Sequence, residues 1–133
     1  MTHEFACHVY YEDTDLAGIV YYANYLKYIE RARTEFVRGL GLDQTALRKA
    51  QGLVFAVRRV EADYLQAARF DDELQVQTSV QSVSGARVVL AQGVARGPER
   101  LFEAVVTLVC LQENGRAARI PAEFRAKLEQ ILV

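Results

Sequence analysis

The chain has 133 residues, of which 51% are apolar and 25% are charged, and its formal net charge is −1. This size and composition are typical of a single globular domain that buries its own core. The near-neutral charge argues against an extended nucleic-acid interface, which needs a basic surplus to neutralise phosphates. No run of about 18 apolar residues occurs, so we expect no membrane span.

The N-terminus and the cysteines indicate a cytoplasmic protein. The first five residues, MTHEF, lack the positive start and the apolar stretch of a secretory signal. The two cysteines, Cys7 and Cys110, each lie in an apolar segment. We interpret them as small buried hydrophobic residues rather than as a disulfide. We therefore expect a cytoplasmic protein made of one domain, residues 1–133, without a linker or an internal repeat.

The first predicted elements are a strand, a turn and a long helix. Residues 5–11 mix aromatic and β-branched side chains, which is typical of a strand. Residues 12–21 hold two Asp, one Thr and one Gly, which is typical of a turn. From Tyr22 onward, apolar residues recur every three or four positions, which predicts an amphipathic helix over about residues 22–39. The apolar stripe of this helix consists of Tyr25, Ile29, Ala32, Phe36 and Leu40.

The rest of the chain adds a short helix, a block of strands and a closing helix. The short helix is predicted over residues 43–50, with Asp43 as its N-cap and Gly52 beyond its end. Strand patterns, with alternating or β-branched apolar residues, cover residues 53–64, 74–80, 87–96 and 101–112. Pro121 opens the last helix. One long helix ahead of a block of antiparallel strands indicates an α+β fold, with the sheet packed on that helix.

The residues that carry chemistry lie between the first strand and the long helix. This segment holds two carboxylates, Asp13 and Asp15, followed by Gly18 and an apolar run. The first N–H groups of a helix have no partner within it, and the helix dipole adds positive charge, so such a terminus can receive a developing oxyanion. A nearby carboxylate can attack a carbonyl or activate water. The residues alone favour a plain helix cap over such an acyl-transfer site.

A longer motif changes that balance. The string D-T-D-x-x-G-x-V-Y-Y-x-x-Y at residues 13–25, followed by E-R-A-R at residues 30–33, resembles the signature of the YbgC-like acyl-CoA thioesterases, which belong with the 4-hydroxybenzoyl-CoA thioesterases. The segment D-Y-L-x-A-x-x-x-D-D-x-L at residues 63–74 also resembles that family. The resemblance implies a hotdog fold, in which a long antiparallel sheet wraps around the central helix. It also implies homodimers or homotetramers with active sites at the subunit interface.

The resemblance also implies residue roles in the hydrolysis of an acyl thioester to a carboxylic acid and free CoA. Asp15 matches the essential carboxylate, and the backbone N–H of Tyr22 matches the oxyanion donor. Asp15 would either attack the thioester carbonyl, giving an anhydride, or deprotonate the attacking water, and both routes stay open. Many relatives have His where this chain has Tyr22, so any contribution of that His is absent or altered here. We interpret Asp13 as a residue that holds the loop through backbone hydrogen bonds.

The same motif predicts the residues that surround the substrate. The candidates for the acyl side are Gly18, Val20, Tyr21 and Tyr25, although Tyr25 also falls on the apolar stripe of the helix. For the phosphates of CoA, which surface guanidinium groups can bind, we single out Arg58 and Arg87. Arg87 follows a Ser-Gly turn, in a region where the family tends to contact the nucleotide end of CoA. Further candidates of the same kind are Arg59, Arg116 and Arg119.

No cofactor and no metal ion are predicted, because neither His3 nor His8 has metal-site spacing to the loop carboxylates. Two alternatives to a thioesterase stay open. The first is a hotdog acyl-thioester hydratase, which usually needs a carboxylate and a His as a pair. The second is a non-catalytic or weakly catalytic protein that binds acyl carrier protein or phospholipid-synthesis enzymes, or that is linked with the Tol-Pal envelope system as YbgC-like relatives are.

Overall fold

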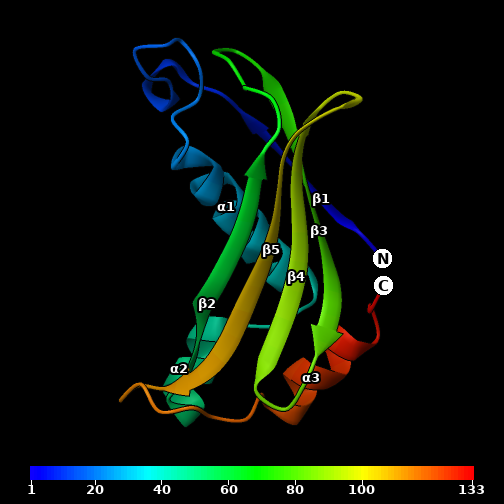
Figure 1. The fold of residues 1–133 in the computed structure, drawn as a ribbon. Helices are drawn as coiled ribbons and strands as arrows, with labels where there is room; N and C mark the ends of the chain where they lie inside the picture. The colour runs from blue at the N-terminus through cyan, green and yellow to red at the C-terminus, as the bar shows by residue number, and fades with distance from the viewer.

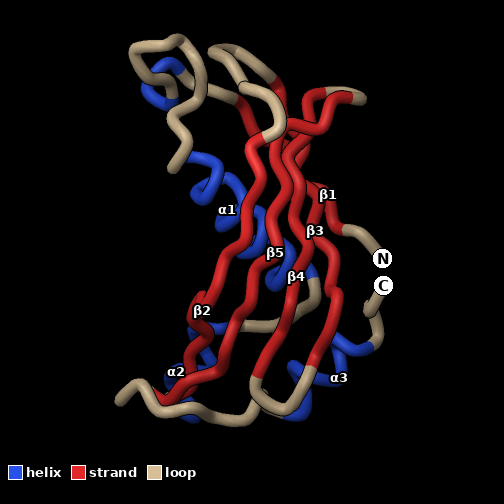
Figure 2. Tube along the Cα trace, viewed as in Figure 1, coloured by secondary structure: helices blue, strands red, loops and turns tan.

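Five antiparallel strands form one sheet in the computed structural model, which describes residues 1–133 (Figure 1). Their order across the sheet is β1-β3-β4-β5-β2, so β1 and β2 lie at the two edges. The strands are β1 (His3–His8), β2 (Leu53–Tyr64), β3 (Glu73–Val83), β4 (Arg87–Arg96) and β5 (Glu99–Gln112). The sheet curves around the long helix α1 (Asn24–Gly39), which confirms the predicted α+β arrangement (Figure 2).

Helix α1 is held on the sheet by the apolar stripe that its sequence predicts. The stripe residues Tyr25, Ile29, Ala32 and Phe36 are buried, and Tyr28 joins them. They meet the inward-facing side chains of the central strands, because alternate residues of a strand point to the same face. Burial of side chains of this kind typically contributes about 1.5–3 kcal/mol each, so the stripe dominates the attachment of α1.

A small polar network crosses this apolar layer. The side-chain amide of Gln92 on β4 donates to the Ile29 carbonyl at 3.0 Å and to the Thr78 hydroxyl at 2.9 Å. Its Oε1 accepts from Nη1 of Arg33 on α1 at 2.9 Å. Gln92 and Thr78 are both buried, and because each has hydrogen-bond partners their burial carries no large penalty. The network fixes how α1 is placed along β4.

Several predicted boundaries are wrong by two or three residues, including the end of β3, at Val83 rather than at residue 80, and two boundaries beside the motif. The first strand ends at His8 rather than at residue 11, because Tyr11–Asp13 turn into a short 3-10 helix, η1, in which the Asp13 carboxylate accepts from the Tyr10 N–H at 2.9 Å. The long helix begins at Asn24 rather than at Tyr22. Both differences lie beside the motif, where side chains and distant backbone groups compete with regular structure for the same hydrogen bonds.

Two short helices, α2 (Gln44–Gln51) and α3 (Ala122–Glu129), cover the end of the sheet opposite the motif loop (Figure 1). The predicted N-cap of α2 is confirmed, because the Asp43 carboxylate accepts from the Ala46 N–H at 3.0 Å. Phe124 and Leu128 of α3 are buried in a second core cluster beneath the C-terminal half of α1. None of the helices has the length and apolar character needed to span a membrane.

Candidate active site

The motif loop folds back on itself as a small hairpin ahead of α1. Thr14 and Val20 form an antiparallel bridge, and the Asp15 N–H donates to the Ile19 carbonyl at 2.9 Å. Gly18 stands at the tip with φ +79°, in the left-handed region that glycine adopts without strain, and its N–H donates to the Asp15 carbonyl at 2.9 Å. The hairpin therefore turns tightly around the backbone of Asp15.

The Asp15 side chain is exposed and only half committed to the loop. Its Oδ1 accepts from the Ala17 N–H at 2.9 Å, which sets the orientation of the carboxylate. Its Oδ2 has no hydrogen-bond partner in the chain. By contrast, the Asp13 carboxylate is used to hold the turn at Tyr10, which confirms the interpretation of Asp13 as a loop-holding residue. One carboxylate of the pair is structural, and the other has an oxygen free to act on a ligand.

The Tyr21–Tyr22 peptide presents a free N–H beside the start of α1. The Tyr21 carbonyl accepts from the Asn24 N–H at 2.8 Å, and in a trans peptide the N–H points away from the carbonyl of the same unit. The Tyr22 N–H therefore faces away from the helix, and it has no acceptor in the chain. The next peptide is held as well, because the Tyr64 hydroxyl donates to the Tyr22 carbonyl at 3.0 Å.

One backbone oxygen ties the loop to the helix. The Asp13 carbonyl accepts from the Tyr21 N–H at 2.9 Å and from Nδ2 of Asn24, also at 2.9 Å. Asn24 thus acts in two ways. Its backbone N–H orients the Tyr21–Tyr22 peptide, which carries the free N–H, and its side chain anchors the segment that leads to Asp15. Neither Asn24 nor Tyr64 was assigned a role from the sequence. The sequence offered one indication of their roles, which is that both residues lie inside the two segments that resemble the family.

The side chains of two of the predicted substrate residues are buried in the core beneath the loop rather than exposed on it. Tyr25 is 3% exposed, stacks on Phe102 with ring centroids 5.0 Å apart, and accepts through its hydroxyl oxygen from the Ala68 N–H. Val20 is also buried, and its N–H donates to the Ala68 carbonyl at 2.8 Å. Both residues therefore support the loop from the core, and burial raises the pKa of Tyr25.

The other predicted residues are accessible but are spread over the chain. Gly18 and Tyr21 are exposed on the loop, and the Tyr22 side chain is 62% exposed. Arg58 is exposed at a bulge in the middle of β2, whereas Arg87 begins β4 at the end of the sheet remote from the loop (Figure 1). A single chain therefore does not bring Arg87 to the Asp15 loop.

The histidines and cysteines lie outside this loop. His8 is held by the carboxylates of Glu73 and Asp71, and these two hydrogen bonds raise its pKa, the one to Glu73 most. These contacts make His8 a residue that ties β1 to the start of β3. Cys7 and Cys110 are free, as expected. No group of three or more His, Cys, Asp or Glu side chains is arranged to hold a metal ion.

A curved antiparallel sheet around one long helix, with a carboxylate loop at the start of that helix, defines the class of hotdog-fold thioesterases. Comparison with known proteins agrees, because residues 9–128 match the model of the thioesterase-like superfamily. The chain belongs to this family, on the branch of the YbgC acyl-CoA thioesterases. The acyl-CoA thioesterase YbgC of Haemophilus influenzae is 44% identical over 96% of this chain and 94% of its own length.

Two further relatives support the assignment. The acyl-CoA thioester hydrolase YbgC of Escherichia coli is 42% identical over 92% of both chains. The crystal structure of a probable thioesterase from Bartonella henselae superposes with a TM-score of 0.86 at 35% identity, covering 91% of this chain and all of the other. The resemblance inferred from the two motifs is therefore confirmed for both the family and the fold.

Proposed function

We propose that this protein hydrolyses acyl-CoA thioesters to a carboxylic acid and free CoA, with Asp15 and the Tyr22 N–H as its catalytic groups. One observation carries the proposal: the loop presents a carboxylate oxygen without a partner and a backbone N–H without an acceptor, and the two share the anchor at the Asp13 carbonyl. A thioester needs both kinds of group, one for nucleophilic attack and one for the oxyanion that follows.

The Tyr22 N–H would donate a hydrogen bond to the thioester carbonyl oxygen. This hydrogen bond becomes stronger as negative charge develops on that oxygen. Loss of one such donor typically costs about 3–4 kcal/mol of barrier, so the backbone contributes as much as a catalytic side chain. Asp15 would attack the carbonyl carbon to give an acyl-aspartyl anhydride, or it would take a proton from the attacking water. In the first route the thiolate of CoA leaves as the anhydride forms, and water then hydrolyses the anhydride to the acid and the free Asp15 carboxylate. In the second route water itself displaces the thiolate, which takes up a proton.

The remaining predicted residues fit around this centre in different ways. Gly18 and Tyr21 would contact the substrate directly, whereas Val20 and Tyr25 would act from the core by holding the loop. We further propose that Arg58 binds a CoA phosphate. Arg87 would do so only across a subunit interface, because it lies at the far end of the sheet in its own chain (Figure 1).

An exposed sheet edge supports the proposal of a homodimer. Strand β2 pairs with β5 on one side and has no partner in the chain on the other, although it is 12 residues long. Its side chains Val57 and Val60 are exposed apolar groups, and a long edge of this kind readily pairs with another strand. Two β2 strands would join two sheets into one, and light scattering on the purified protein would give twice the chain mass. A single-chain mass would refute the pairing.

Location and partners complete the proposal. The reaction as written uses no cofactor, since CoA is part of the substrate, and a cytoplasmic location agrees with two free cysteines. Acyl carrier protein would be an alternative carrier of the acyl group. A mainly partner-binding role, linked to the Tol-Pal system or to phospholipid synthesis, and a hydratase activity are the competing functions that the activity assay must exclude.

The assay measures thiol release with a chromogenic reagent over a panel of aliphatic and aryl acyl-CoAs. The chain's own thiols interfere little, because burial raises the pKa of Cys7 to about 11. We expect turnover by the parent protein and a loss of at least about 100-fold in kcat for Asp15→Asn. Glu12→Gln is the matched control, because Glu12 is an exposed carboxylate of the same loop. Background thiol release with every substrate would refute the function, and near-parental turnover by Asp15→Asn would refute the mechanism.

A further inference from the structure

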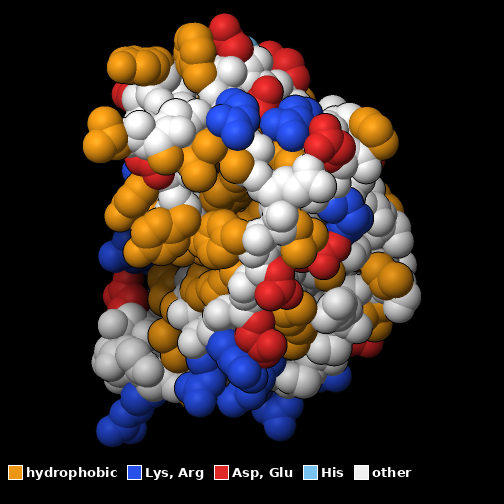
Figure 3. Space-filling model, turned by 45° about the horizontal axis from the view of Figure 1, so that its top comes forward, with side chains coloured by type: hydrophobic (Ala, Val, Ile, Leu, Met, Phe, Trp, Pro, Cys, Tyr) orange, Lys and Arg blue, Asp and Glu red, His pale blue; other side chains and the backbone are white.

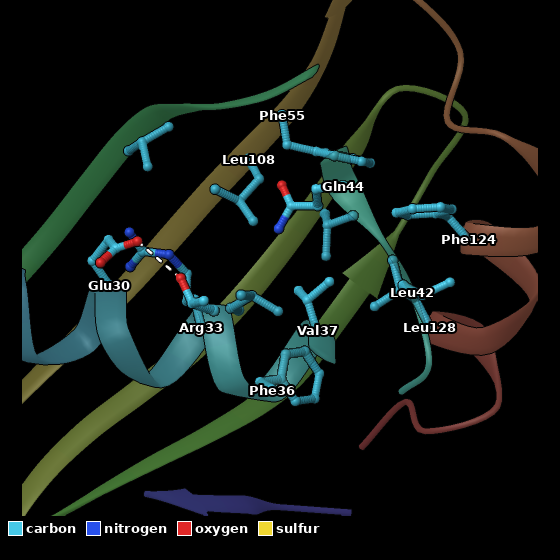
Figure 4. Close-up of a pocket in the computed structure, with 14 residues that line it drawn as sticks. Glu30, Arg33, Phe36, Val37, Leu42, Gln44, Phe55, Leu108, Phe124 and Leu128 are labelled. Atoms are coloured by element: carbon cyan, nitrogen blue, oxygen red, sulfur yellow. Dashed lines mark hydrogen bonds between the residues drawn. The ribbon is translucent and has the colours of Figure 1, made fainter. Parts of the chain in front are cut away.

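A cavity of about 230 Å³ lies between the C-terminal half of α1, the helix α3 and the inner face of the sheet (Figure 4). Ten of its 14 lining residues are hydrophobic. Phe124 and Leu128 stand at one end, and Glu30 and Arg33 stand at the other, as the close-up shows. The cavity therefore has an apolar floor and a polar mouth, and it is separate from the loop that carries Asp15.

The inner face of β2 leads from the loop to this cavity. Five of its residues pair with successive inward-facing residues of β5. The bulge at Arg58 adds one residue to β2, so that these five side chains face inward on both sides of the bulge. These five residues are Tyr64, Ala62, Val60, Val57 and Phe55. Tyr64 lies at the Tyr22 carbonyl, and Val57 and Phe55 line the cavity. The row therefore runs from the candidate oxyanion donor to the cavity over uncharged side chains.

Helix α1 supplies the opposite wall. Leu26 and Glu30 are four residues apart in α1, so they share one face of the helix, and Tyr22 lies just before its first turn. Glu30 lines the cavity, and Leu26, in the first turn of α1, is 41% exposed. We call the surface between this face and the inner face of β2 the trough. Figure 3 shows apolar side chains gathered along a hollow, with Lys and Arg at both ends.

We propose that the trough and the cavity bind a long, unbranched acyl chain, with the thioester at Tyr22 and the tail end against Phe124 and Leu128. This inference rests on the proposed thioesterase function and names its substrate class. From Asn24, the first residue of α1 after Tyr22 and Ala23, to Glu30 the helix axis advances about 9 Å, at about 1.5 Å per residue. A short acyl group therefore ends in the trough, and only a long chain enters the cavity.

The cavity matches such a tail in size and chemistry. At about 230 Å³ the cavity is many times larger than the space that one water molecule needs, so it has room for several methylene groups. Each methylene that leaves water for this apolar floor favours binding. At the mouth, Glu30 accepts from the Thr34 hydroxyl and Arg33 donates to Gln92, so these polar groups are held at the wall rather than across the path.

The test compares palmitoyl-CoA with butyryl-CoA in variants that fill the cavity. Val37→Phe adds a ring to the lining from α1, and Val57→Phe adds one from β2, where the Val57 side chain is 47% exposed in the single chain. We expect the parent to prefer palmitoyl-CoA. In each variant kcat/KM for palmitoyl-CoA should fall at least tenfold, while the value for butyryl-CoA changes less than twofold. Val105→Phe, on the outer face of the sheet, is the matched control.

The outcomes separate the two proposals. An active parent that prefers butyryl-CoA, or variants with an unchanged ratio of the two kcat/KM values, would refute the cavity as the tail site and leave the thioesterase function intact. A parent without activity on any thioester would refute the function itself, and the tail site with it. If Val37→Phe does not fold, as judged by circular dichroism, Val57→Phe decides the question alone.

Discussion

Asn24 offers the sharpest test of how the site is held together. Its side-chain amide reaches the Asp13 carbonyl at 2.9 Å, and its backbone N–H orients the Tyr21–Tyr22 peptide. In Asn24→Ala only the side-chain bond is lost, and the Asp13 carbonyl keeps the Tyr21 N–H as a partner. The expected loss of stability is therefore about 1 kcal/mol, the usual net value of one hydrogen bond. With an unfolding entropy of about 2.1 cal/mol/K per residue, this corresponds to a fall in Tm of about 4 °C.

The effect on catalysis should be much larger than the effect on stability. Without this anchor the loop is free to shift relative to the helix start, and a displacement of about 1 Å between reacting groups can cost about 100-fold in rate. We expect kcat to fall by about that factor, with KM changed less than about threefold. Asn24→Asp should not restore activity, because a carboxylate cannot donate to the Asp13 carbonyl.

Steady-state kinetics and thermal unfolding of the same samples check this expectation. Asn114→Ala is the matched control, because it also removes one local side-chain hydrogen bond, at 3.0 Å from the Arg116 N–H, in the turn after β5. It should lose a similar amount of stability and keep its kcat. If Asn24→Ala keeps kcat within about threefold of the parent while its Tm falls, Asn24 is a purely structural residue and the positioning argument is wrong.

Two further predictions concern stability. Gly18→Ala should destabilise the protein by about 1–2 kcal/mol, because Gly18 has φ +79° and the new methyl group meets no atom within 4 Å, so backbone strain acts alone. Gly39→Ala, at the end of α1 and equally free of contacts, should instead be neutral or stabilising in urea unfolding. The pKa of His8 is raised from 6.5 by Glu73 and Asp71, so its stabilising contribution is full below about pH 6.5 and is lost as the pH rises through the raised pKa. Unfolding of His8→Gln should therefore differ from that of the parent more at low than at high pH, and a constant difference would contradict the assignment.

The secondary structure of this protein follows closely from local patterns. The stripe of α1 and the alternation of the long strands depend on spacings of about 3.6 and two residues, which neighbouring residues alone determine. The same holds for the α2 cap, where Asp43 acts on Ala46 only three residues away. Besides the end of β3, which extends to Val83 rather than to residue 80, prediction failed at the edges of the motif loop. The boundaries there depend on hydrogen bonds such as that from the Val20 N–H to the Ala68 carbonyl, which join distant segments.

The catalytic motif shows the same division. Asp15 and Tyr22 were identified from a string of residues, because the family that shares this string preserves residue types at fixed spacings. The supporting roles of Asn24 and Tyr64 did not follow from the string. Each role depends on a contact across 11 or 42 residues of the chain. The burial of Tyr25 was predicted by its place on the apolar stripe, but its hydrogen bond from the Ala68 N–H, which makes it a support of the loop, joins residues 43 positions apart.

The sequence by itself thus determined the class of fold, the order of its elements and the two groups proposed for catalysis, because periodicity and a short motif are properties of neighbouring residues. Only the tertiary structure decided which carboxylate oxygen and which N–H remain without partners. It alone also placed a cavity beyond the loop, with walls that come from α1, α3 and three strands. The physical reason is that hydrogen-bond satisfaction and empty volume are properties of packed segments, and the segments that meet here are far apart in the chain.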